Sequence, residues 1–362
     1  MTVSIAARLC AVVAGLMVFV SAGEWAGTAG GGGMPRAAAA AAPVRVLYAG
    51  SLLNVFERDL APAFTRRTGI IVLGRAGGST SLAHLIRDGL APADVFVSAD
   101  PVVNRILAPR AGGPAAGNDV TKPGAPSVGW FLTCGSTSMV IAYAPGSRFA
   151  PLLRQAVDPG PAGPADPALQ RRAWFRVLAT PGLRLGRTDP ALDPKGYRAL
   201  FVLKLAERYY HDPGLAARVL GDEENPSQIF PEEALLGRLD SGQLDAGFFY
   251  LVEAIARHLP YLTLPPALNL ADPAFAAAYA TATYVDTSGV THRGGPVLYT
   301  VAIPSSARNT DGAARFVAFL LGPEGRGLLA ARGVLRVPIL AGGDPATIPA
   351  SLRPLVGGTY HP

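Results

Sequence analysis

Three short turns rich in small hydroxyl residues are the first candidates for chemistry in this sequence of 362 residues. They are residues 49–52 (AGSL), 77–81 (GGSTS) and 135–138 (GSTS). Glycine lets an anion approach the backbone N–H groups, and a serine or threonine adds a hydroxyl donor. Turns of this kind that meet in the fold would form an uncharged binding site for an oxyanion. Alternatively, each serine or threonine only caps the helix that follows it.

Asp193 and Tyr250 are two further candidates. Asp193 begins the sequence DPKGYR, and a proline directly after an aspartate is typical of a helix N-cap followed by the first helical residue. That capping role explains Asp193 completely, because a carboxylate repels a bound anion unless it coordinates the anion's central atom. Tyr250 lies in a predicted strand, where an aromatic side chain is more often part of the core.

The composition excludes several kinds of enzyme site. None of the three lysines follows a glycine, so there is no phosphate-binding loop of the G-K-[ST] type. The two cysteines form no C-x-x-C motif, and Cys10 lies in the predicted leader, which excludes a disulfide and a cysteine-based zinc site in the mature chain. The five histidines form no H-E-x-x-H motif, and no pair of carboxylates is marked out for glycoside hydrolysis.

A secreted serine hydrolase is the alternative from another functional class. It would use Ser51 or Ser79 as the nucleophile, although the sequence has no G-x-S-x-G motif. Such an enzyme needs a histidine within hydrogen-bond reach of the serine. His84, on the helix predicted after Ser79, is the one candidate for that base.

Alternating strands and helices would position the first two turns. Short apolar runs predict strands at residues 44–48, 70–73 and 94–98, and a helix is predicted after each strand. This pattern is typical of an α/β fold with helices on the faces of a parallel sheet. In such a sheet the turns after the strands meet at one edge, where ligands bind.

The rest of the chain continues this mixture of strands and helices. Further strands are predicted at 139–143, 245–252 and 297–303, and helices at 102–107, 197–210, 232–239 and 313–321. Residues 109–129 and 145–168 are rich in proline and glycine, which predicts loops.

Residues 1–42 have the layout of a secretory signal peptide followed by a flexible tether. Arg8 precedes an apolar run at residues 10–20, and glycine and alanine runs occupy residues 30–33 and 37–42. The apolar run is too short to span a membrane comfortably, although an uncleaved anchor is the alternative. We therefore expect an exported protein, periplasmic or associated with the cell surface, whose N-terminal segment contacts the membrane surface if it is retained.

Charge gives no indication of a nucleic-acid partner. The chain has 32 basic and 26 acidic side chains, a net charge of +6, and 49% apolar residues. The net charge is +3 in residues 44–137, −1 in residues 138–297 and +3 in residues 298–362. No basic stripe with interleaved aromatic residues is present, so nucleic-acid binding is not expected.

Several segments along residues 44–330 form a set of motifs in a fixed order. They include VLYAGSL (46–52), AGGSTSLAHLIRDG (76–89), PADVFVSADP (92–101), DPKGYRALFVLKLAERYY (193–210), LDSGQLDAGFFYLVEA (239–254) and GGPVLYTVAIP (294–304). This set resembles the molybdate/tungstate-binding periplasmic proteins of ABC transporters, most of all their tungstate-type branch. The resemblance implies two α/β lobes with the type II periplasmic-binding-protein fold, joined by hinge strands.

The resemblance also implies where the lobes and the hinge lie. Residues 44–137 and 298–350 would form the first lobe, and residues 138–297 the second. The chain would cross between the lobes near residues 139–143 and return near residues 297–303. An anion bound in the cleft would be enclosed when the lobes close.

Four site residues follow from the same resemblance, motif by motif. Ser51 and Ser79 would donate side-chain and backbone hydrogen bonds from the first lobe. Thr137 and Ser138 would contribute backbone N–H groups from the crossing between the lobes. All four belong to the hydroxyl turns described above.

Asp193 and Tyr250 complete the set implied by the resemblance. Asp193 matches the aspartate that ligates the metal of the oxyanion in the tungstate-type branch, and Tyr250 matches an aromatic residue beside the other ligand. That other ligand is a Glu in a Phe-Glu-Tyr sequence, but Phe249 stands at its position here. Glu253 falls three residues too late to replace it. This departure favours tetrahedral, hydrogen-bonded binding over octahedral coordination.

We therefore expect an extracytoplasmic solute-binding protein that captures molybdate or tungstate and delivers it to an ABC permease. It would act as a monomer, without a cofactor and without catalysing a reaction. Another oxyanion or a small organic anion is the alternative ligand. A sensor or interaction protein that keeps the fold without transport is a third alternative.

Overall fold

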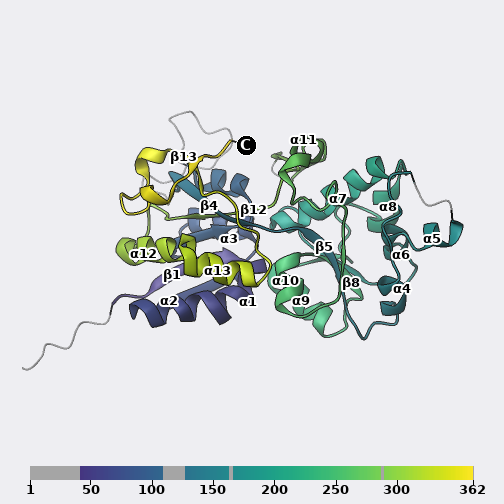
Figure 1. The fold of residues 1–362 in the computed structure, drawn as a ribbon, viewed down its shortest axis with the longest axis horizontal. Coiled ribbons are helices and arrows are strands. Elements are labelled where there is room, and N and C mark those ends of the chain that lie inside the picture. Colours follow the sequence, from purple (N-terminus) through teal and green to yellow (C-terminus); the bar gives the residue numbers. More distant parts are fainter. Residues whose placement is uncertain (1–40, 109–126, 163–165, 287–288, 362) are drawn as a thin grey trace, which may run out of the picture. The chain divides into compact units, whose positions relative to one another are not determined.

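The computed structural model describes residues 41–108, 127–162, 166–286 and 289–361 (Figure 1). The chain separates into Met1–Ala39 and Ala40–Pro362, and every described residue belongs to the second part. The predicted signal peptide and nearly all of the predicted tether therefore lie outside the described residues. In the described ranges, no helix has the length and apolar character needed to cross a membrane.

Seven strands form the larger sheet, in the order β14-β13-β4-β12-β3-β1-β2. The strands are β1 (Val44–Ala49), β2 (Val72–Gly77), β3 (Val95–Ser98), β4 (Trp130–Ser136), β12 (Leu298–Ala302), β13 (Leu340–Gly343) and β14 (Gly358–Thr359). β1 pairs in parallel with β2 and β3, whereas β12 pairs antiparallel with β3 and β4. The first three strands therefore end at the same edge of the sheet, as their alternation with helices predicted.

Helices cover both faces of this sheet. Val46 and Tyr48 of β1 point into one apolar cluster with Phe316, whereas Leu47 points into another with Leu82, because successive residues of a strand face opposite sides. The helical segments are η1 (Gly50–Leu52), α1 (Leu53–Val55), η2 (Phe56–Leu60), α2 (Ala61–Thr68), α3 (Ser79–Arg87), η3 (Pro101–Leu107), α12 (Thr310–Leu321) and α13 (Pro323–Ala331).

Five strands form the smaller sheet, in the order β7-β6-β8-β5-β9. They are β5 (Met139–Tyr143), β6 (Leu185–Thr188), β7 (Ile229–Phe230), β8 (Ala246–Tyr250) and β9 (Tyr261–Thr263). The helices of this part are α4 (Ala150–Arg154), α5 (Pro167–Arg171), α6 (Trp174–Leu178), α7 (Pro194–Tyr209), α8 (Leu215–Leu220), α9 (Glu232–Asp240), α10 (Leu251–Ala256) and α11 (Ala276–Tyr279). A hairpin of β10 (Thr283–Val285) and β11 (Thr291–Arg293) lies near α7.

We call the larger sheet with its helices the first lobe, and the smaller sheet with its helices the second lobe (Figure 1). The chain passes from the first sheet to the second between β4 and β5 and returns in β12. The lobe limits expected from the sequence stay a prediction. β14, which pairs with β13 in the first sheet, lies beyond the expected limit at residue 350.

Some elements differ from those predicted. β2 begins at Val72 and continues to Gly77, so it starts and ends later than the strand predicted at residues 70–73 and includes Gly77 of the predicted second turn. It is an edge strand whose middle residues are exposed, and the apolar pattern therefore did not mark residues 74–77. Residues 102–107 form part of the 3-10 helix η3, and Leu251 and Val252 belong to α10 and not to the preceding strand.

Other elements were not predicted at all. β4 is buried along its whole length, and its final Cys-Gly-Ser sequence resembles a turn more than a strand. The short helix α4 lies in the segment predicted as a loop, and α5 begins in it. Proline is the second residue of α4 and the first of α5, and it suits loops as well as helix starts. α6, β6 and α8 are four to six residues long and give too little periodicity to be recognised.

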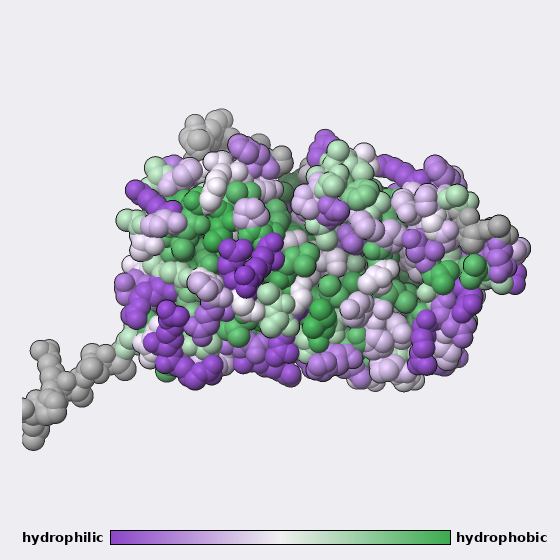
Figure 2. Space-filling model, viewed as in Figure 1, coloured by the Kyte–Doolittle hydropathy of each residue, from purple (hydrophilic) through white to green (hydrophobic). Residues whose placement is uncertain are grey.

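The most exposed large apolar side chains are spread over several segments of the chain. In Figure 2, apolar side chains are interspersed with hydrophilic ones over the visible face. The most exposed large apolar residues belong to different segments: Leu90 follows α3, Val285 ends β10, and Ile71 precedes β2.

Candidate functional site

The first two hydroxyl turns lie side by side at the carboxyl ends of β1 and β2. Ala49, the last residue of β1, pairs with Gly77, the last residue of β2. Ser51 therefore follows one strand and Ser79 the next, at the same edge of the sheet. β3 ends at this edge too, which brings Asp100 into the same region.

Neither serine caps its own helix. Ser51 is 5% exposed, and its Oγ lies 3.0 Å from the hydroxyl oxygen of Tyr299 in β12. Ser79 is fully buried, and its Oγ accepts a hydrogen bond of 3.1 Å from the backbone N–H of Ala99. The N-cap residue of each helix makes no side-chain hydrogen bond. The capping alternative is therefore wrong for both turns, because each hydroxyl contacts a distant segment instead.

The third turn connects β4 to β5, so that a strand and not a helix follows it. Thr137 is fully buried, and its Oγ1 has no hydrogen-bond partner among the described residues. No role was predicted for Ser136, and its buried Oγ likewise has no hydrogen-bond partner among the described residues. Ser138 is half-buried, and its carbonyl accepts a hydrogen bond of 2.9 Å from Leu251. An unpaired buried hydroxyl costs about 1–3 kcal/mol, so a ligand that accepts these hydrogen bonds would be favoured.

Asp193 caps α7, as the sequence predicted. Its Oδ1 accepts hydrogen bonds of 2.9 Å from the backbone N–H of Lys195 and 2.9 Å from Oγ1 of Thr188. Burial raises the pKa of the Asp193 carboxyl, although the positive charge of Lys195 and the backbone N–H of Ser79 oppose this. Asp193 of the second lobe is therefore in contact with the start of α3 in the first lobe.

Lys195 is a buried cation that the sequence did not indicate as part of the site. Its Nζ lies 2.8 Å from a carboxylate oxygen of Glu232 and 2.8 Å from one of Glu253, and the residue is 1% exposed. Burial alone would lower the pKa of Lys195, but the two carboxylates outweigh burial and raise it above its ordinary value. The ammonium group is therefore charged and already paired twice.

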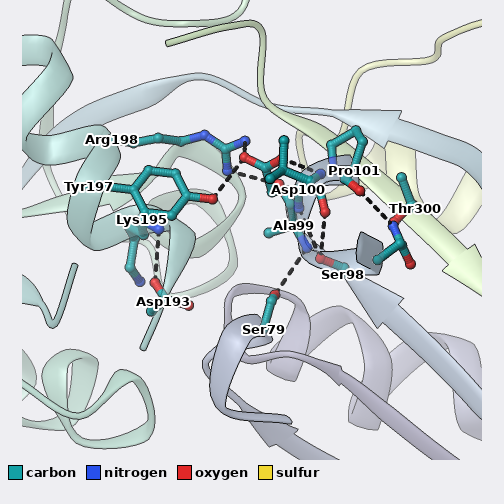
Figure 3. Close-up of polar contacts among 12 residues, drawn as sticks. Ser79, Ser98, Ala99, Asp100, Pro101, Asp193, Lys195, Tyr197, Arg198 and Thr300 are labelled. Carbon is teal, nitrogen blue, oxygen red and sulfur yellow. Dashed lines mark hydrogen bonds and ion pairs between the residues drawn. The ribbon is translucent and has the colours of Figure 1, made fainter. Parts of the chain in front are cut away.

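Arg198 joins the two lobes (Figure 3). Its Nη1 donates to the carbonyl oxygen of Ala99 at 2.8 Å and to the hydroxyl oxygen of Tyr250 at 2.6 Å. Its Nη2 lies 2.6 Å from Oδ2 of Asp100. The hydroxyl of Tyr197 donates to the same Asp100 oxygen at 2.9 Å. Apart from Tyr250, these residues belong to the DPKGYR motif and to the end of PADVFVSADP, but spacing alone could not show that they meet.

Tyr250 and Phe249 face opposite sides of β8. The ring of Tyr250 is packed edge-on against that of Tyr299, with 6.3 Å between the ring centroids. Burial raises the pKa of the Tyr250 hydroxyl, although Arg198 opposes this, so the hydroxyl keeps its proton at neutral pH. Phe249 is fully buried in the apolar cluster on the other side of the strand, which also contains Leu235.

Continuous contacts connect four of the six residues predicted for the site. The order of contact is Ser51, Tyr299, Tyr250, Arg198, Ala99, Ser79 and Asp193. The other two, Thr137 and Ser138, directly precede Met139, which pairs with Tyr250 across β5 and β8. The predicted residues therefore occupy one region of contact between the lobes.

A cavity of about 210 Å³ opens between the lobes beside this region. Its lining includes Gly78 and Ser81 from the first lobe and Asp193 and Glu232 from the second. The backbone N–H of Ser81 donates to the carbonyl oxygen of Leu192 at 3.1 Å. A Cβ atom at Gly78 would lie 2.6 Å from that same oxygen, so glycine permits the lobes to approach here.

The described residues show no metal cluster, and neither candidate serine is hydrogen-bonded to a histidine. In the described ranges, no three His, Cys, Asp or Glu side chains are placed to hold one metal ion. The hydroxyls of Ser51 and Ser79 contact Tyr299 and Ala99, and neither contacts His84. The hydroxyl and backbone N–H donors of this arrangement are suited to holding an anion by hydrogen bonds.

Comparisons with known proteins agree with the fold. Residues 44–335 match the family described as bacterial extracellular solute-binding protein. A putative ABC transporter molybdenum-binding protein of Haloferax volcanii is 35% identical over 271 residues, which are 75% of this chain and 74% of that protein. The molybdate/tungstate-binding protein WtpA of Thermococcus kodakarensis is 27% identical over 307 residues, 78% of each chain.

A solved structure shows the same kind of fold. The periplasmic molybdate-binding protein of Azotobacter vinelandii superposes with a TM-score of 0.50 at 21% sequence identity. The superposition covers 81% of this chain and 99% of the other. The two-lobed α/β fold expected from the sequence is thereby confirmed.

Proposed function

The chain belongs to the bacterial extracellular solute-binding proteins, and we propose that it captures molybdate or tungstate between its lobes and delivers the anion to an ABC permease. The relatives named for molybdenum, molybdate or tungstate support this choice of ligand. An exported protein, periplasmic or at the cell surface, fits this function. We propose that it acts as a monomer, with no cofactor and no reaction catalysed.

The observation that carries the proposal is a set of buried hydroxyls whose protons are free to be donated. Ser79 accepts a hydrogen bond from Ala99 through its oxygen, which leaves its own proton available. The Tyr250 oxygen accepts from Arg198, and because a guanidinium group can only donate, the Tyr250 proton is available too. Thr137 has a hydroxyl without a partner in the described part of the chain. A fully ionised oxyanion accepts hydrogen bonds and donates none, so it matches this set.

The charged groups near the site are already paired with each other, which supports binding of the anion by uncharged hydrogen-bond donors. Lys195 is paired with Glu232 and Glu253, and Arg198 is paired with Asp100. Neither cation is therefore left to form an ion pair with the ligand. Backbone N–H groups and hydroxyls that are fixed by the fold hold an anion without the desolvation of a new ion pair.

We propose tetrahedral binding without a carboxylate ligand to the metal. Phe249, at the position of the second carboxylate in the tungstate-type branch, is fully buried in an apolar cluster. Glu253 is engaged by Lys195 and by the backbone N–H of Tyr250 at 2.8 Å. Asp193 is engaged in capping α7. Of the three positions that could supply a carboxylate to the metal, one is occupied by Phe249, and the carboxylates of Glu253 and Asp193 already accept other hydrogen bonds.

A panel of oxyanions tests the proposed function. Molybdate or tungstate at micromolar concentration should raise the melting temperature, because a ligand at 100 times its Kd stabilises the fold by about 2.7 kcal/mol. Sulfate, phosphate and chromate form the comparison arms, and a larger response to one of them would identify another oxyanion as the ligand. If neither molybdate nor tungstate changes the melting temperature, the proposal is wrong.

The double variant Ser51→Ala, Ser79→Ala tests whether the hydroxyl turns form the site. Neither serine caps a helix, so the variant should keep its fold and lose at least tenfold in molybdate affinity, measured by titration calorimetry. Unchanged affinity would place the anion elsewhere.

A further inference from the structure

Asp100 is shared between the two lobes, one carboxylate oxygen for each. Its Oδ1 accepts a hydrogen bond of 2.8 Å from the backbone N–H of Val102 and caps η3 within the first lobe. Its Oδ2 accepts hydrogen bonds from Tyr197 at 2.9 Å and from Arg198 at 2.6 Å, both from α7 of the second lobe. The first oxygen thus serves the local fold, and the second serves the contact between lobes.

The segment that carries Asp100 is also fixed from the first lobe. Ala99 donates its backbone N–H to Ser79 and accepts from Arg198 through its carbonyl oxygen (Figure 3). Ser98 donates its hydroxyl to the carbonyl oxygen of Asp100 at 2.8 Å. Arg198 therefore contacts two acceptors that the first lobe holds in place, the carbonyl oxygen of Ala99 and the carboxylate of Asp100. The N–H of Ala99 is in turn hydrogen-bonded to Ser79, a proposed donor to the ligand.

Because Arg198 is charged, its contact with Asp100 affects the balance between closed and open lobes. Among the groups that Arg198 contacts, Asp100 is the one carboxylate, and Ala99 and Tyr250 are neutral acceptors. Arg198 is 3% exposed with the lobes in contact. A guanidinium group buried without its carboxylate is strongly unfavourable, whereas the same group is readily hydrated when the lobes are apart. Loss of the carboxylate therefore disfavours the closed arrangement and leaves an open one unaffected.

We propose that Asp100, with Tyr197 and Arg198, forms an interlobe latch that sets how tightly the ligand is held without touching it. This inference rests on the proposed function, because it takes closure of the lobes as the event that encloses the ligand. Asp100 is a positioning residue: it holds Arg198, which in turn holds the hydroxyl of Tyr250. Loss of the latch should shift the lobes toward an open arrangement and weaken binding.

The variant Asp100→Asn separates the two roles of this residue. The amide keeps an oxygen to cap η3 but places an NH₂ group against the hydroxyl of Tyr197 and the guanidinium of Arg198, so that donors face donors. Asp344→Asn is the matched control. Asp344 also caps a 3-10 helix that begins with proline, through a hydrogen bond of 3.0 Å from Ala346, and it is exposed.

Molybdate affinity by titration calorimetry and the radius of gyration by X-ray scattering, with and without molybdate, test the latch. Asp100→Asn should bind molybdate at least tenfold more weakly than the wild type and compact less at a given ligand concentration, whereas Asp344→Asn should match the wild type. Tyr197→Phe removes one of the two interlobe donors and should fall between them. It replaces Asp100→Asn in the comparison if that variant does not fold.

Wild-type affinity and compaction in the Asp100→Asn variant would overturn the latch and leave the proposed function standing. If the wild type binds no oxyanion of the panel, the proposed function fails instead. The latch is then decided by the ligand-free radius of gyration. A larger value for Asp100→Asn than for wild type and Asp344→Asn supports the latch, and equal values overturn it.

Discussion

The role of Asp193 distinguishes two modes of oxyanion binding: tetrahedral binding by hydrogen bonds, and coordination of the metal by a carboxylate. One of its oxygens accepts from Thr188 and from the backbone of Lys195, and these contacts account for its place at the start of α7. An amide can make these two contacts, because it also offers one oxygen acceptor. A carboxylate that coordinated molybdenum or tungsten could not be replaced in this way.

Asp193→Asn is therefore expected to keep molybdate affinity within about threefold of the wild type, as measured by titration calorimetry. Asp193→Ala, which removes the cap, should lower the free energy of unfolding by about 1 kcal/mol. If Asp193→Asn loses affinity by more than tenfold while its unfolding is unchanged, direct coordination of the metal replaces the tetrahedral form of binding proposed here.

Sequence patterns predicted some of these residues because their signal is local. Ser51 and Ser79 stand in glycine-containing turns after strands, and Asp193 precedes a proline at a helix start. Lys195, Arg198 and Asp100 carried no such local signal of a role. Their importance comes from partners 37 to 98 residues away in the chain, and a single sequence does not record which charges will be paired.

At the scale of elements, one buried carboxylate fixes the start of β8, the strand that carries Tyr250. Asp245 accepts hydrogen bonds from the backbone and side chain of Arg184 before β6, and from the hydroxyl of Ser147 after β5. Asp245 thereby ties together the ends of three neighbouring strands. Burial alone would raise the pKa of Asp245, but the hydrogen bonds from Arg184 and Ser147 outweigh burial and lower it to about 2.

This shift predicts the acid stability of the second lobe. A carboxyl with a lowered pKa stabilises the fold above its unfolded-state value of 3.8, and that stabilisation is lost as pH falls toward about 2. Asp245→Asn should therefore be less stable than the wild type by about 1–2 kcal/mol at pH 6, with the difference vanishing near pH 2. Urea unfolding at several pH values measures it, and a difference that does not change with pH would contradict this account.

Long or strongly patterned elements were predicted well, and short ones were not. The helix predicted at residues 197–210 corresponds to α7, and Asp193 and Pro194 begin it as expected. β4 was missed although its first three residues are apolar, because a strand buried on both faces lacks an alternating pattern. Its place between β12 and β13 depends on pairing with residues more than 150 positions away.

At the scale of the whole molecule, the approach of the lobes depends on small residues at the contact. Gly78 has an ordinary backbone conformation, with φ of −59°, so glycine is not needed there for its flexibility. A methyl group at this position would instead lie 2.6 Å from the carbonyl oxygen of Leu192 and 3.2 Å from Cβ of Asp193, both in the second lobe. The clash is therefore between lobes and not within one.

Gly78→Ala is expected to leave each lobe folded and to hinder their closure. Molybdate affinity should fall at least tenfold, because a backbone oxygen cannot move aside as the end of a flexible side chain can. Gly146→Ala is the control, since a Cβ atom at that exposed glycine meets nothing within 4 Å. Titration calorimetry measures the effect on molybdate affinity, and the melting temperature without ligand measures the effect on the stability of the fold. Wild-type affinity in Gly78→Ala would show that the lobes hold the ligand without this contact, whereas a large loss of ligand-free stability would show that it belongs to the fold itself.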